Sequence, residues 1–258
     1  MPSTIVAIGN ELLGGFTLDT NSNWLAQQLQ RLGFPLKRIT VVRDRHADII
    51  EQLRRDLSDP EVEDIFCSGG LGPTPDDLTY EAIAAALGRQ LIIWQPVLER
   101  IQRRAQRMHE AGLTDSPEVS EGNIRMARIP SAPDHVFRNR KGMAPAAMFR
   151  VDGRRLFVLP GVPMELKGIF TEEVETEFLA GRSGAVVREL RFSFAPESRF
   201  YQVMRELEGT HPHVSVGSYP NLESRELTIR LSGHDGAEVL EAADLLQSRA
   251  ADMGYVPV

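Results

Sequence analysis

A glycine-rich segment carries the residues best suited to binding a phosphate group. It runs from Gly69 to Asp77 and reads GGLGPTPDD. The apolar run Asp64–Cys67 precedes it and a helical pattern follows it, which is the position at which open α/β sheets bind ligands. Glycine lets backbone N–H groups come close to an anion, and the start of a helix adds partial positive charge. The segment therefore predicts a phosphate-binding loop.

The acidic end of this loop sets it apart from the common phosphate loops. A P-loop ends in Gly-Lys-Ser/Thr, and the dinucleotide fingerprint needs a small residue where this chain has Pro75. Asp76 and Asp77 would repel a phosphate unless a divalent cation bound by oxygen ligands lay between them. The loop therefore predicts a bound metal ion. The alternative for Asp77 is an N-cap on the helix expected over residues 78–87.

Further carboxylates are expected at the same edge of the sheet. Asp44 ends the second predicted strand, and Glu11 and Asp19 follow the first. Each of them, taken alone, is explained as a solvated loop carboxylate. Their convergence at the carboxyl ends of parallel strands is what favours a site.

Two later loops complete the predicted pocket. Lys141 can neutralise the charge of a phosphate, with an exposed loop lysine as the alternative. Pro160 and Gly161 stand at the start of a helix, where proline has a structural reason to occur. We interpret them as part of the pocket wall.

Four apolar segments without alternation predict strands that are buried on both faces. They are Thr4–Gly9, Ile39–Val42, Asp64–Cys67 and Leu156–Leu159. Between them, apolar residues recur at helical spacing, as in Leu25, Leu29 and Leu32. This alternation predicts an α/β fold with a three-layer, doubly wound, mostly parallel sheet and right-handed crossovers.

The region after Leu87 is less regular. A predicted helix carries one arginine-rich face, which we interpret as solvated. Its arginines are Arg100, Arg103, Arg104 and Arg107. Residues 112–141 contain three prolines and no long periodicity, so we expect loops and short strands there, leading into a strand over 146–151.

The character of the strands changes after Gly181. Leu227, Ile229 and Leu231 alternate with polar residues, which indicates an antiparallel sheet with one face in water. Three such strands and two helical patterns follow in the order β-α-β-β-α. We therefore predict two domains, residues 1–182 and a small α+β domain over residues 183–258.

Composition narrows the class of protein. The net charge of -7 disfavours a surface that coats nucleic acid, so a small molecule is the expected partner. The only cysteine, Cys67, lies in an apolar run and is expected in the core. The six histidines show no zinc-ligand spacing. No targeting segment or membrane span is recognisable, and we expect a cytoplasmic protein.

Five ordered motifs between Ile5 and Phe178 resemble the N-terminal domain of CinA, the competence/damage-inducible protein A family. They are Gly9–Leu13, Asp19–Asn21, Gly69–Thr79, Asn139 with Gly142–Pro145, and Leu159–Pro163. That domain has the molybdopterin-binding fold shared with MoaB, MogA and one domain of MoeA. Residues beyond 182 look like the small KH-type module that follows in CinA. CinA proteins usually carry a further deamidase domain; we expect none in this chain, so deamidase activity is not implied.

The resemblance implies a divalent-metal-dependent pyrophosphatase, a hydrolase that cleaves ADP-ribose or a related nucleoside diphosphate sugar with Mg²⁺, Mn²⁺ or Co²⁺. It implies a homodimer as well. Asp44 and Asp77 match positions linked to catalysis, and the expected metal ligands are Asp44, Asp76 and Asp77. The residues expected to bind the ligand and its phosphates are Glu11, Asn21, Gly69, Gly70, Leu71, Gly72, Thr74, Asn139, Lys141, Gly142, Pro160 and Gly161.

Two alternatives to this activity remain open. The same fold in MoaB and MogA binds molybdopterin and adenylylates it, so the ligand can be a pterin rather than a nucleotide. The chain also departs from the usual family pattern, with Asn10 in place of an aspartate and Met143 in place of a threonine. A nucleotide-binding protein without catalysis is therefore the third hypothesis.

Overall fold

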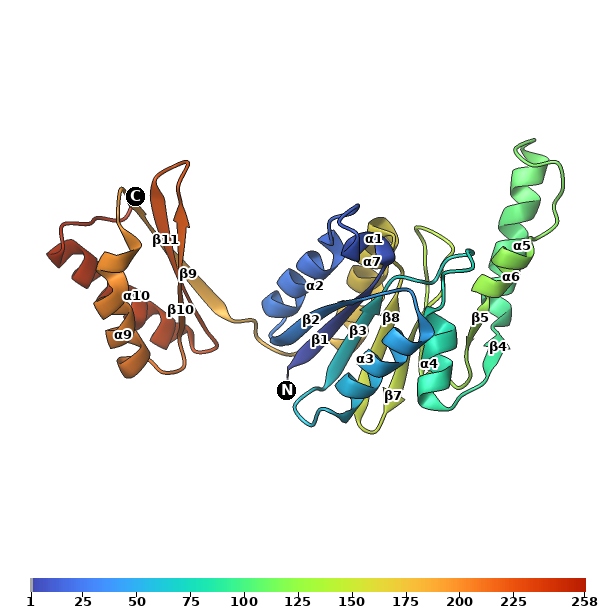
Figure 1. The fold of residues 1–258 in the computed structure, drawn as a ribbon, viewed down its shortest axis with the longest axis horizontal. Coiled ribbons are helices and arrows are strands. Elements are labelled where there is room, and N and C mark those ends of the chain that lie inside the picture. Colours follow the sequence, from blue (N-terminus) through green and yellow to red (C-terminus); the bar gives the residue numbers. More distant parts are fainter. Residues whose placement is uncertain (1) are drawn as a thin grey trace. The chain divides into compact units, whose positions relative to one another are not determined.

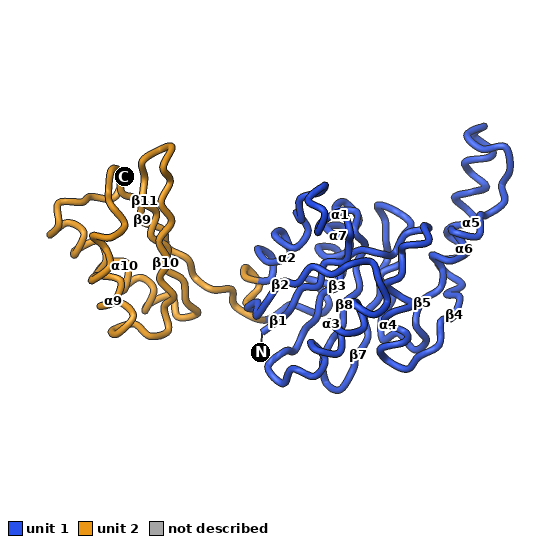
Figure 2. The backbone as a smooth tube through the Cα atoms, viewed as in Figure 1, with its two compact units in different colours: residues 1–29, 34–181 blue, residues 30–33, 182–258 orange. Residues whose placement is uncertain are grey.

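The computed structural model describes residues 2–258, which divide into two compact units. Within the described residues, the first consists of residues 2–29 and 34–181, and the second of residues 30–33 and 182–258 (Figures 1 and 2). None of the helices in the described part of the chain combines the length and the apolar character needed to cross a lipid bilayer.

A six-stranded sheet in the order β2-β1-β3-β8-β7-β6 forms the centre of the first unit. Its parallel strands are β1 (Ser3–Ile8), β2 (Leu36–Val42), β3 (Asp64–Ser68) and β8 (Arg154–Leu159), and its antiparallel part adds β7 (Ala146–Val151) and β6 (His135–Phe137). The chain moves from β1 to β2 on one side and then returns to β3 on the other. This reversal of strand order is the topological switch point at which such sheets bind ligands. The predicted doubly wound sheet is confirmed.

Helices cover both faces of this sheet (Figure 1). One face packs against α2 (Thr20–Arg31) and the run formed by α7 (Pro163–Ile169), the π-helical turn η1 (Phe170–Val174) and α8 (Glu175–Phe178). The other face packs against α3 (His46–Ser58) and α4 (Thr79–Leu87). The two faces explain the uninterrupted apolar strands, since Ile65 meets one layer and Phe66, stacked on Phe157, meets the other.

The irregular region contains more structure than its sequence indicates. A short helix, α1 (Asn10–Leu13), lies near the start of the chain. The predicted helix with the arginine-rich face is present as α5 (Gln95–Glu110), and the same region also contains β4 (Leu91–Ile93), α6 (Glu121–Met126) and β5 (Arg128–Pro130). Strands β4 and β5 pair in a separate two-stranded sheet. We expected only loops and short strands over residues 112–141. The six-residue helix α6 was missed because its sole signal is the N-cap Ser120, which accepts a hydrogen bond from Asn123 N.

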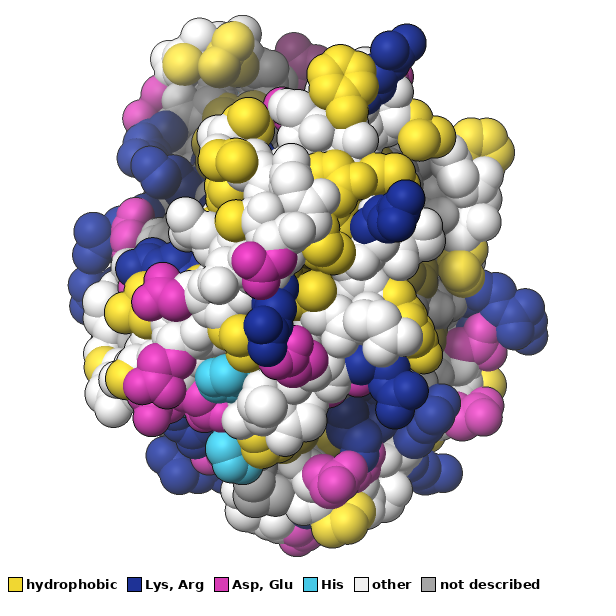
Figure 3. All heavy atoms as spheres, turned by 90° about the vertical axis from the view of Figure 1, so that its left-hand side faces the viewer, with side chains coloured by type: hydrophobic (Ala, Val, Ile, Leu, Met, Phe, Trp, Pro, Cys, Tyr) yellow, Lys and Arg dark blue, Asp and Glu magenta, His cyan; other side chains and the backbone are white. Residues whose placement is uncertain are grey.

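The second unit has the predicted order β-α-β-β-α. It consists of β9 (Val186–Ser193), a 3₁₀ turn η2 (Glu197–Phe200), α9 (Tyr201–Thr210), β10 (Ser215–Asn221), β11 (Glu226–Gly233) and α10 (Gly236–Asp252). Its strands pair antiparallel in the order β10-β11-β9. Leu227, Ile229 and Leu231 are buried while Arg230 is exposed, as the alternation predicts. Basic, acidic and hydrophobic side chains are interspersed on the molecular face in Figure 3.

Candidate functional site

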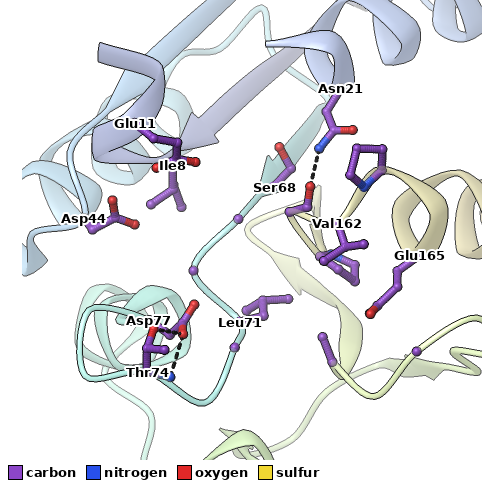
Figure 4. Close-up of a pocket in the computed structure, with 18 of the residues that line it drawn as sticks. Ile8, Glu11, Asn21, Asp44, Ser68, Leu71, Thr74, Asp77, Val162 and Glu165 are labelled. Atoms are coloured by element: carbon purple, nitrogen blue, oxygen red, sulfur yellow. Dashed lines mark hydrogen bonds between the residues drawn. The ribbon is translucent and has the colours of Figure 1, made fainter. Parts of the chain in front are cut away.

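A pocket of about 550 Å³ opens at the carboxyl ends of three parallel strands. Ile8 at the end of β1, Ser68 at the end of β3 and Pro160 just after β8 all line it (Figure 4). The volume is within the range of small-molecule sites in proteins. The switch point of the sheet is therefore the site of a ligand-sized cavity.

The glycine loop passes through this pocket in a conformation that requires glycine. Gly69 has φ +103° and Gly70 has φ +65°. A Cβ atom on Gly69 would collide with the carbonyl oxygen of Ile8, and one on Gly70 with the hydroxyl of Thr79. The buried Thr79 fixes the loop by donating from Oγ1 to Gly69 O at 2.8 Å and from its backbone N to Gly70 O at 3.2 Å. The close approach to the backbone of Ile8 explains Gly69, and the contact with the Thr79 side chain together with a positive φ explains Gly70.

Three consecutive backbone donors of this loop are free. Within residues 2–258, the N–H groups of Gly70, Leu71 and Gly72 form no hydrogen bond, whereas Gly69 N donates to Leu159 O. All three residues line the pocket. Successive free N–H groups at the edge of a sheet form an anion-binding concavity. The unpartnered N–H groups agree with the expected phosphate-binding loop, and phosphate binding stays a prediction.

The acidic end of the loop is engaged mainly in holding its own shape. Asp77 Oδ2 accepts a hydrogen bond from Thr74 N at 2.8 Å and another from the Thr74 hydroxyl, which also contacts Asp76 (Figure 4). Asp77 is not the N-cap of α4, because that position belongs to Leu78 and has no side-chain cap. Arg125 of α6 donates to Thr74 O at 2.6 Å and Asp77 O at 2.9 Å. Arg125 therefore braces the loop from the irregular region.

Asp44 also lines the pocket, two residues beyond the end of β2. Its Oδ2 accepts a hydrogen bond from Asn10 N at 2.6 Å. Burial raises the pKa of Asp44 above its usual value, and the nearby charges of Glu11 and Asp76 raise it further. The Thr74 hydroxyl instead lowers the pKa of Asp76. The pKa values of these two carboxyl groups are thus shifted in opposite directions.

The opposite wall of the pocket is shaped by a single buried amide. Asn139 donates from Nδ2 to Ala144 O at 2.9 Å and to the Glu165 carboxylate, and its Oδ1 accepts from Lys141 N at 3.1 Å and Gly142 N at 2.8 Å. All of its hydrogen-bonding capacity is used inside the protein. Asn139 therefore holds the loop over 139–144 and does not itself line the pocket, unlike Lys141 and Gly142.

Asn21 supplies a second amide, from the start of α2. Its Nδ2 donates to Gly161 O at 2.7 Å, whereas its Oδ1 is buried and has no partner in the described part of the chain (Figure 4). A buried acceptor of this kind needs a donor from outside the protein, such as water or a ligand. Asn21 Nδ2 thus holds the backbone at Gly161, and Asn21 Oδ1 is a buried acceptor without a partner among the described residues.

The arginine-rich face of α5 is not simply solvated, which corrects the interpretation of its sequence. Arg100 donates to Met143 O at 3.1 Å, and Arg104 is among the residues that line the pocket. Partial burial lowers the pKa of Arg100. Periodicity alone could not distinguish Arg104 from the solvent-facing arginines, because the contact depends on how α5 packs beside a loop forty residues away.

Fourteen of the residues predicted to form the site line this one pocket. They are Glu11, Asn21, Asp44, Gly69, Gly70, Leu71, Gly72, Thr74, Asp76, Asp77, Lys141, Gly142, Pro160 and Gly161. Asn139 is the exception. Sequence reasoning missed Arg104, Leu18, Val162 and Glu165, which also line the pocket. Glu165 stands in the first turn of the helix that follows Pro160 and Gly161, and that position was its only signal.

The predicted metal ligands are not gathered into a metal cage. Among the described residues, the one group of three ionisable side chains with ligand atoms all within 4.8 Å of one another is His135, Glu173 and Glu177. Asp44, Asp76 and Asp77 do not approach one another this closely. The role of these three aspartates as metal ligands therefore stays a prediction, and no reaction step is derived from it.

Comparison with known proteins decides the family. Residues 4–180 match the family model described as "Probable molybdopterin binding domain". The chain belongs to this molybdopterin-binding family. A protein of Thermococcus kodakarensis is 34% identical over 251 residues, which cover 96% of this chain and 97% of that protein. The family match contains every residue of the pocket.

The resemblance to CinA is confirmed by two further relatives. A CinA-like protein of Myxococcus xanthus is 35% identical over 219 residues, which cover 83% of this chain and 50% of that protein. The crystal structure of CinA from Thermoplasma acidophilum, described as a protein of unknown function, superposes with a TM-score of 0.59 at 29% identity, covering 67% of this chain and 96% of that one. Residues 186–258 match the model of the FAD synthase middle domain, rather than a deamidase.

Proposed function

We propose that this protein binds a phosphorylated pterin of the molybdopterin type in the pocket of its first unit. The observation that carries the proposal is the row of free N–H groups at Gly70, Leu71 and Gly72, which fits a phosphate at the switch point of the sheet. Membership of the molybdopterin-binding family supports a pterin as the remainder of the ligand.

The far side of the pocket suits the ring system of a pterin. A pterin presents amino and ring N–H donors along one edge. The carboxylate of Glu165 is an acceptor at the pocket wall, and Leu18 and Val162 add apolar surface. Lys141 and Arg104 supply positive charge at the same pocket, where their attraction to an anion is favourable. The ligand would thus be held by its phosphate on the glycine loop and by its donor edge on the opposite wall.

The direct test is to identify the ligand that the protein carries. The full chain is purified from cells that make molybdopterin, denatured and oxidised, and the released small molecules are separated with fluorescence detection. We expect a fluorescent, phosphate-bearing pterin in close to one equivalent per chain, and much less from the Gly69→Ala variant. Absence of pterin from the wild-type protein, together with no binding of added molybdopterin, would rule out the proposal.

Hydrolysis of ADP-ribose is the second candidate, and the observation in its favour is the crowding of carboxylates. The charges of Glu11 and Asp76 raise the pKa of Asp44, and a group of neighbouring carboxylates of this kind attracts cations. The test is release of AMP and ribose 5-phosphate from ADP-ribose with Mg²⁺, Mn²⁺ and Co²⁺ tried separately. Activity that disappears in Asp44→Asn would support this candidate. Absence of both products with all three metals would exclude it and leave the pterin proposal unaffected.

The homodimer implied by the resemblance stays a prediction. Size-exclusion chromatography with light scattering gives the mass of the particle in solution, and twice the chain mass of 28.8 kDa is the expected result. A mass equal to that of a single chain would contradict it.

A further inference from the structure

We propose a second site in the first unit, a divalent transition-metal site formed by His135, Glu173 and Glu177. Each of these side chains offers one ligand atom, and the three atoms lie within 4.8 Å of one another. His135 comes from the edge strand β6, Glu173 from the π-helical turn and Glu177 from α8. None of the three residues lines the pocket described above.

The histidine supplies the observation that points to a cation. His135 Nε2 is buried and has no hydrogen-bond partner within residues 2–258, although Glu173 Oε2 lies 3.5 Å away. A buried nitrogen without a hydrogen-bond partner is costly, and the gap of 3.5 Å to Glu173 Oε2 is too long for a normal hydrogen bond. A cation between the two atoms would give both of them a partner.

The spacing of the atoms suits a metal ion in this position. Ligand atoms at about 2.1 Å from a tetrahedral ion are about 3.4 Å apart. The separation of His135 Nε2 and Glu173 Oε2 is 3.5 Å, which exceeds the length of a normal hydrogen bond. Small movements of the exposed Glu177 would bring the third ligand to the same distance.

The surroundings hold the first two ligands in place. Both oxygens of Glu173 accept hydrogen bonds from Arg138 N, at 3.2 and 3.1 Å, and its side chain is only 12% exposed. The His135 ring packs edge-on against Phe178 with centroids 5.3 Å apart, and against Phe137 at 4.7 Å. Partners of this kind orient metal ligands in proteins.

The two glutamates share a face across an unusual turn. They are four residues apart, at the junction between η1 and α8, and so project toward the same side. Single π-helical turns are rare and occur often at functional sites.

The cluster is also far along the helical run from the pocket, since Glu173 follows the pocket residue Glu165 by eight residues, or about 12 Å of helix rise.

The donor set indicates the class of metal. One imidazole and two carboxylates suit Zn²⁺, Co²⁺, Mn²⁺ or Fe²⁺, whereas an all-oxygen cage would favour Mg²⁺ or Ca²⁺. Three protein ligands leave a fourth position open. The ion would tie the end of α8 to the edge strand β6.

The experiment measures metal binding to the full chain. Metal-free protein is titrated with Zn²⁺ by calorimetry, and Co²⁺ is added separately to follow the visible absorption of a tetrahedral ion. We expect one strong equivalent of Zn²⁺ per chain, weakened about tenfold or more in both His135→Ala and Glu177→Gln. Circular dichroism of both variants verifies that they fold, and the exposed Glu177 makes its substitution the safer of the two.

Three control variants separate this site from other possible ones. Glu172→Gln changes a neighbouring carboxylate outside the cluster, and His213→Ala removes a histidine of the second unit. Asp44→Asn removes one of the carboxylates that line the pocket. All three should keep the strong Zn²⁺ equivalent. The proposal is overturned if the wild-type protein binds no Zn²⁺, or if His135→Ala and Glu177→Gln bind it as tightly as the wild type does.

Discussion

The two loops that form opposite walls of the pocket reach their shapes in different ways. The loop over 69–77 is shaped by its backbone, with Gly69 and Gly70 pressed against Ile8 and Thr79. The loop over 139–144 is shaped by one side chain, the buried Asn139, which makes contacts to four other residues. The first loop leaves the N–H groups of Gly70, Leu71 and Gly72 without a hydrogen-bond partner among the described residues. The second loop donates the N–H groups of Lys141 and Gly142 to Asn139 Oδ1. The first loop thus offers backbone donors to a ligand, whereas the second loop is held in place by hydrogen bonds to Asn139.

The largest expected effect comes from adding a methyl group to the backbone-shaped loop. Gly69→Ala places a Cβ against Ile8 O in a region of φ that alanine avoids, and neither backbone can move without disturbing β1 or β3. We expect ligand affinity to fall by about 100-fold or more and stability by about 3 kcal/mol. Affinity is measured by calorimetry with molybdopterin.

Gly88→Ala is the matched control. Gly88 has a similar positive φ of +63°, but its Cβ would meet nothing within 4 Å. It should cost only about 1–2 kcal/mol and leave affinity unchanged. Equal losses of affinity in the two variants would show that the close approach at Gly69 is irrelevant to binding.

The next effect tests the loop shaped by Asn139. Asn139→Ala leaves the N–H groups of Lys141 and Gly142 and the carbonyl of Ala144 without their partner, at a cost of about 2–4 kcal/mol. Urea unfolding followed by tryptophan fluorescence measures this loss in the first unit, because both tryptophans, Trp24 and Trp94, lie there. The exposed Asn23→Ala should be close to neutral. A loss below about 0.5 kcal/mol in Asn139→Ala would contradict the role assigned to this amide.

A smaller effect is expected at the brace between the glycine loop and α6. Arg125→Met keeps most of the aliphatic length but removes the hydrogen bonds to Thr74 O and Asp77 O and the ion pair with Glu81. We expect the free energy of unfolding to fall by about 1–2 kcal/mol and ligand affinity to decrease several-fold. Urea unfolding and calorimetry on the same protein samples measure both. Unchanged affinity would mean that the loop keeps its shape without the brace.

The smallest expected effect is a pH dependence of stability and of ligand binding that arises from the ionisation of Asp44. Its pKa is raised in the folded protein, so the folded state holds this proton to higher pH than the unfolded state does. The free energy of unfolding therefore falls as pH rises from the ordinary aspartate value through the raised pKa. Ligand binding weakens over the same interval, because the ionised Asp44 repels a phosphate.

Asp44→Asn should remove this part of both pH profiles while keeping an acceptor for Asn10 N. Asp76 makes the opposite contribution, since its lowered pKa gives stability that is lost on acidification, so the comparison must use the difference between wild type and variant. Identical pH profiles of stability and binding for the wild type and Asp44→Asn would show that Asp44 does not cause the pH dependence.

The sequence predicted the backbone-shaped wall better than the other one. Gly69 and Gly70 were recognisable because a backbone with positive φ favours glycine, a local property that is visible in the sequence. The buried parallel strands were recognisable for a similar reason, since residues covered on both faces form unbroken apolar runs.

The parts that the sequence did not reveal depend on contacts between distant segments. Arg104 lines the pocket from α5, whose pattern indicates only a solvated face. Arg125 braces the glycine loop from α6, a helix that the sequence did not reveal. Asn139 looked like a ligand-binding residue because it stands in a family motif, but its partners are all in its own protein. His135, Glu173 and Glu177 come together only because β6 packs beside the helical run of η1 and α8. The spacing of residues within each segment does not show that packing.

The central claim is that the free N–H groups of the glycine loop bind a phosphate, and amide NMR tests it most directly. The ¹⁵N-labelled full chain is titrated with oxidised molybdopterin, which is stable and keeps its phosphate. We predict large, saturable shifts of the Gly70, Leu71 and Gly72 amide resonances, and their absence in Gly69→Ala. Saturable binding that leaves these three resonances in place while shifting others would contradict the account.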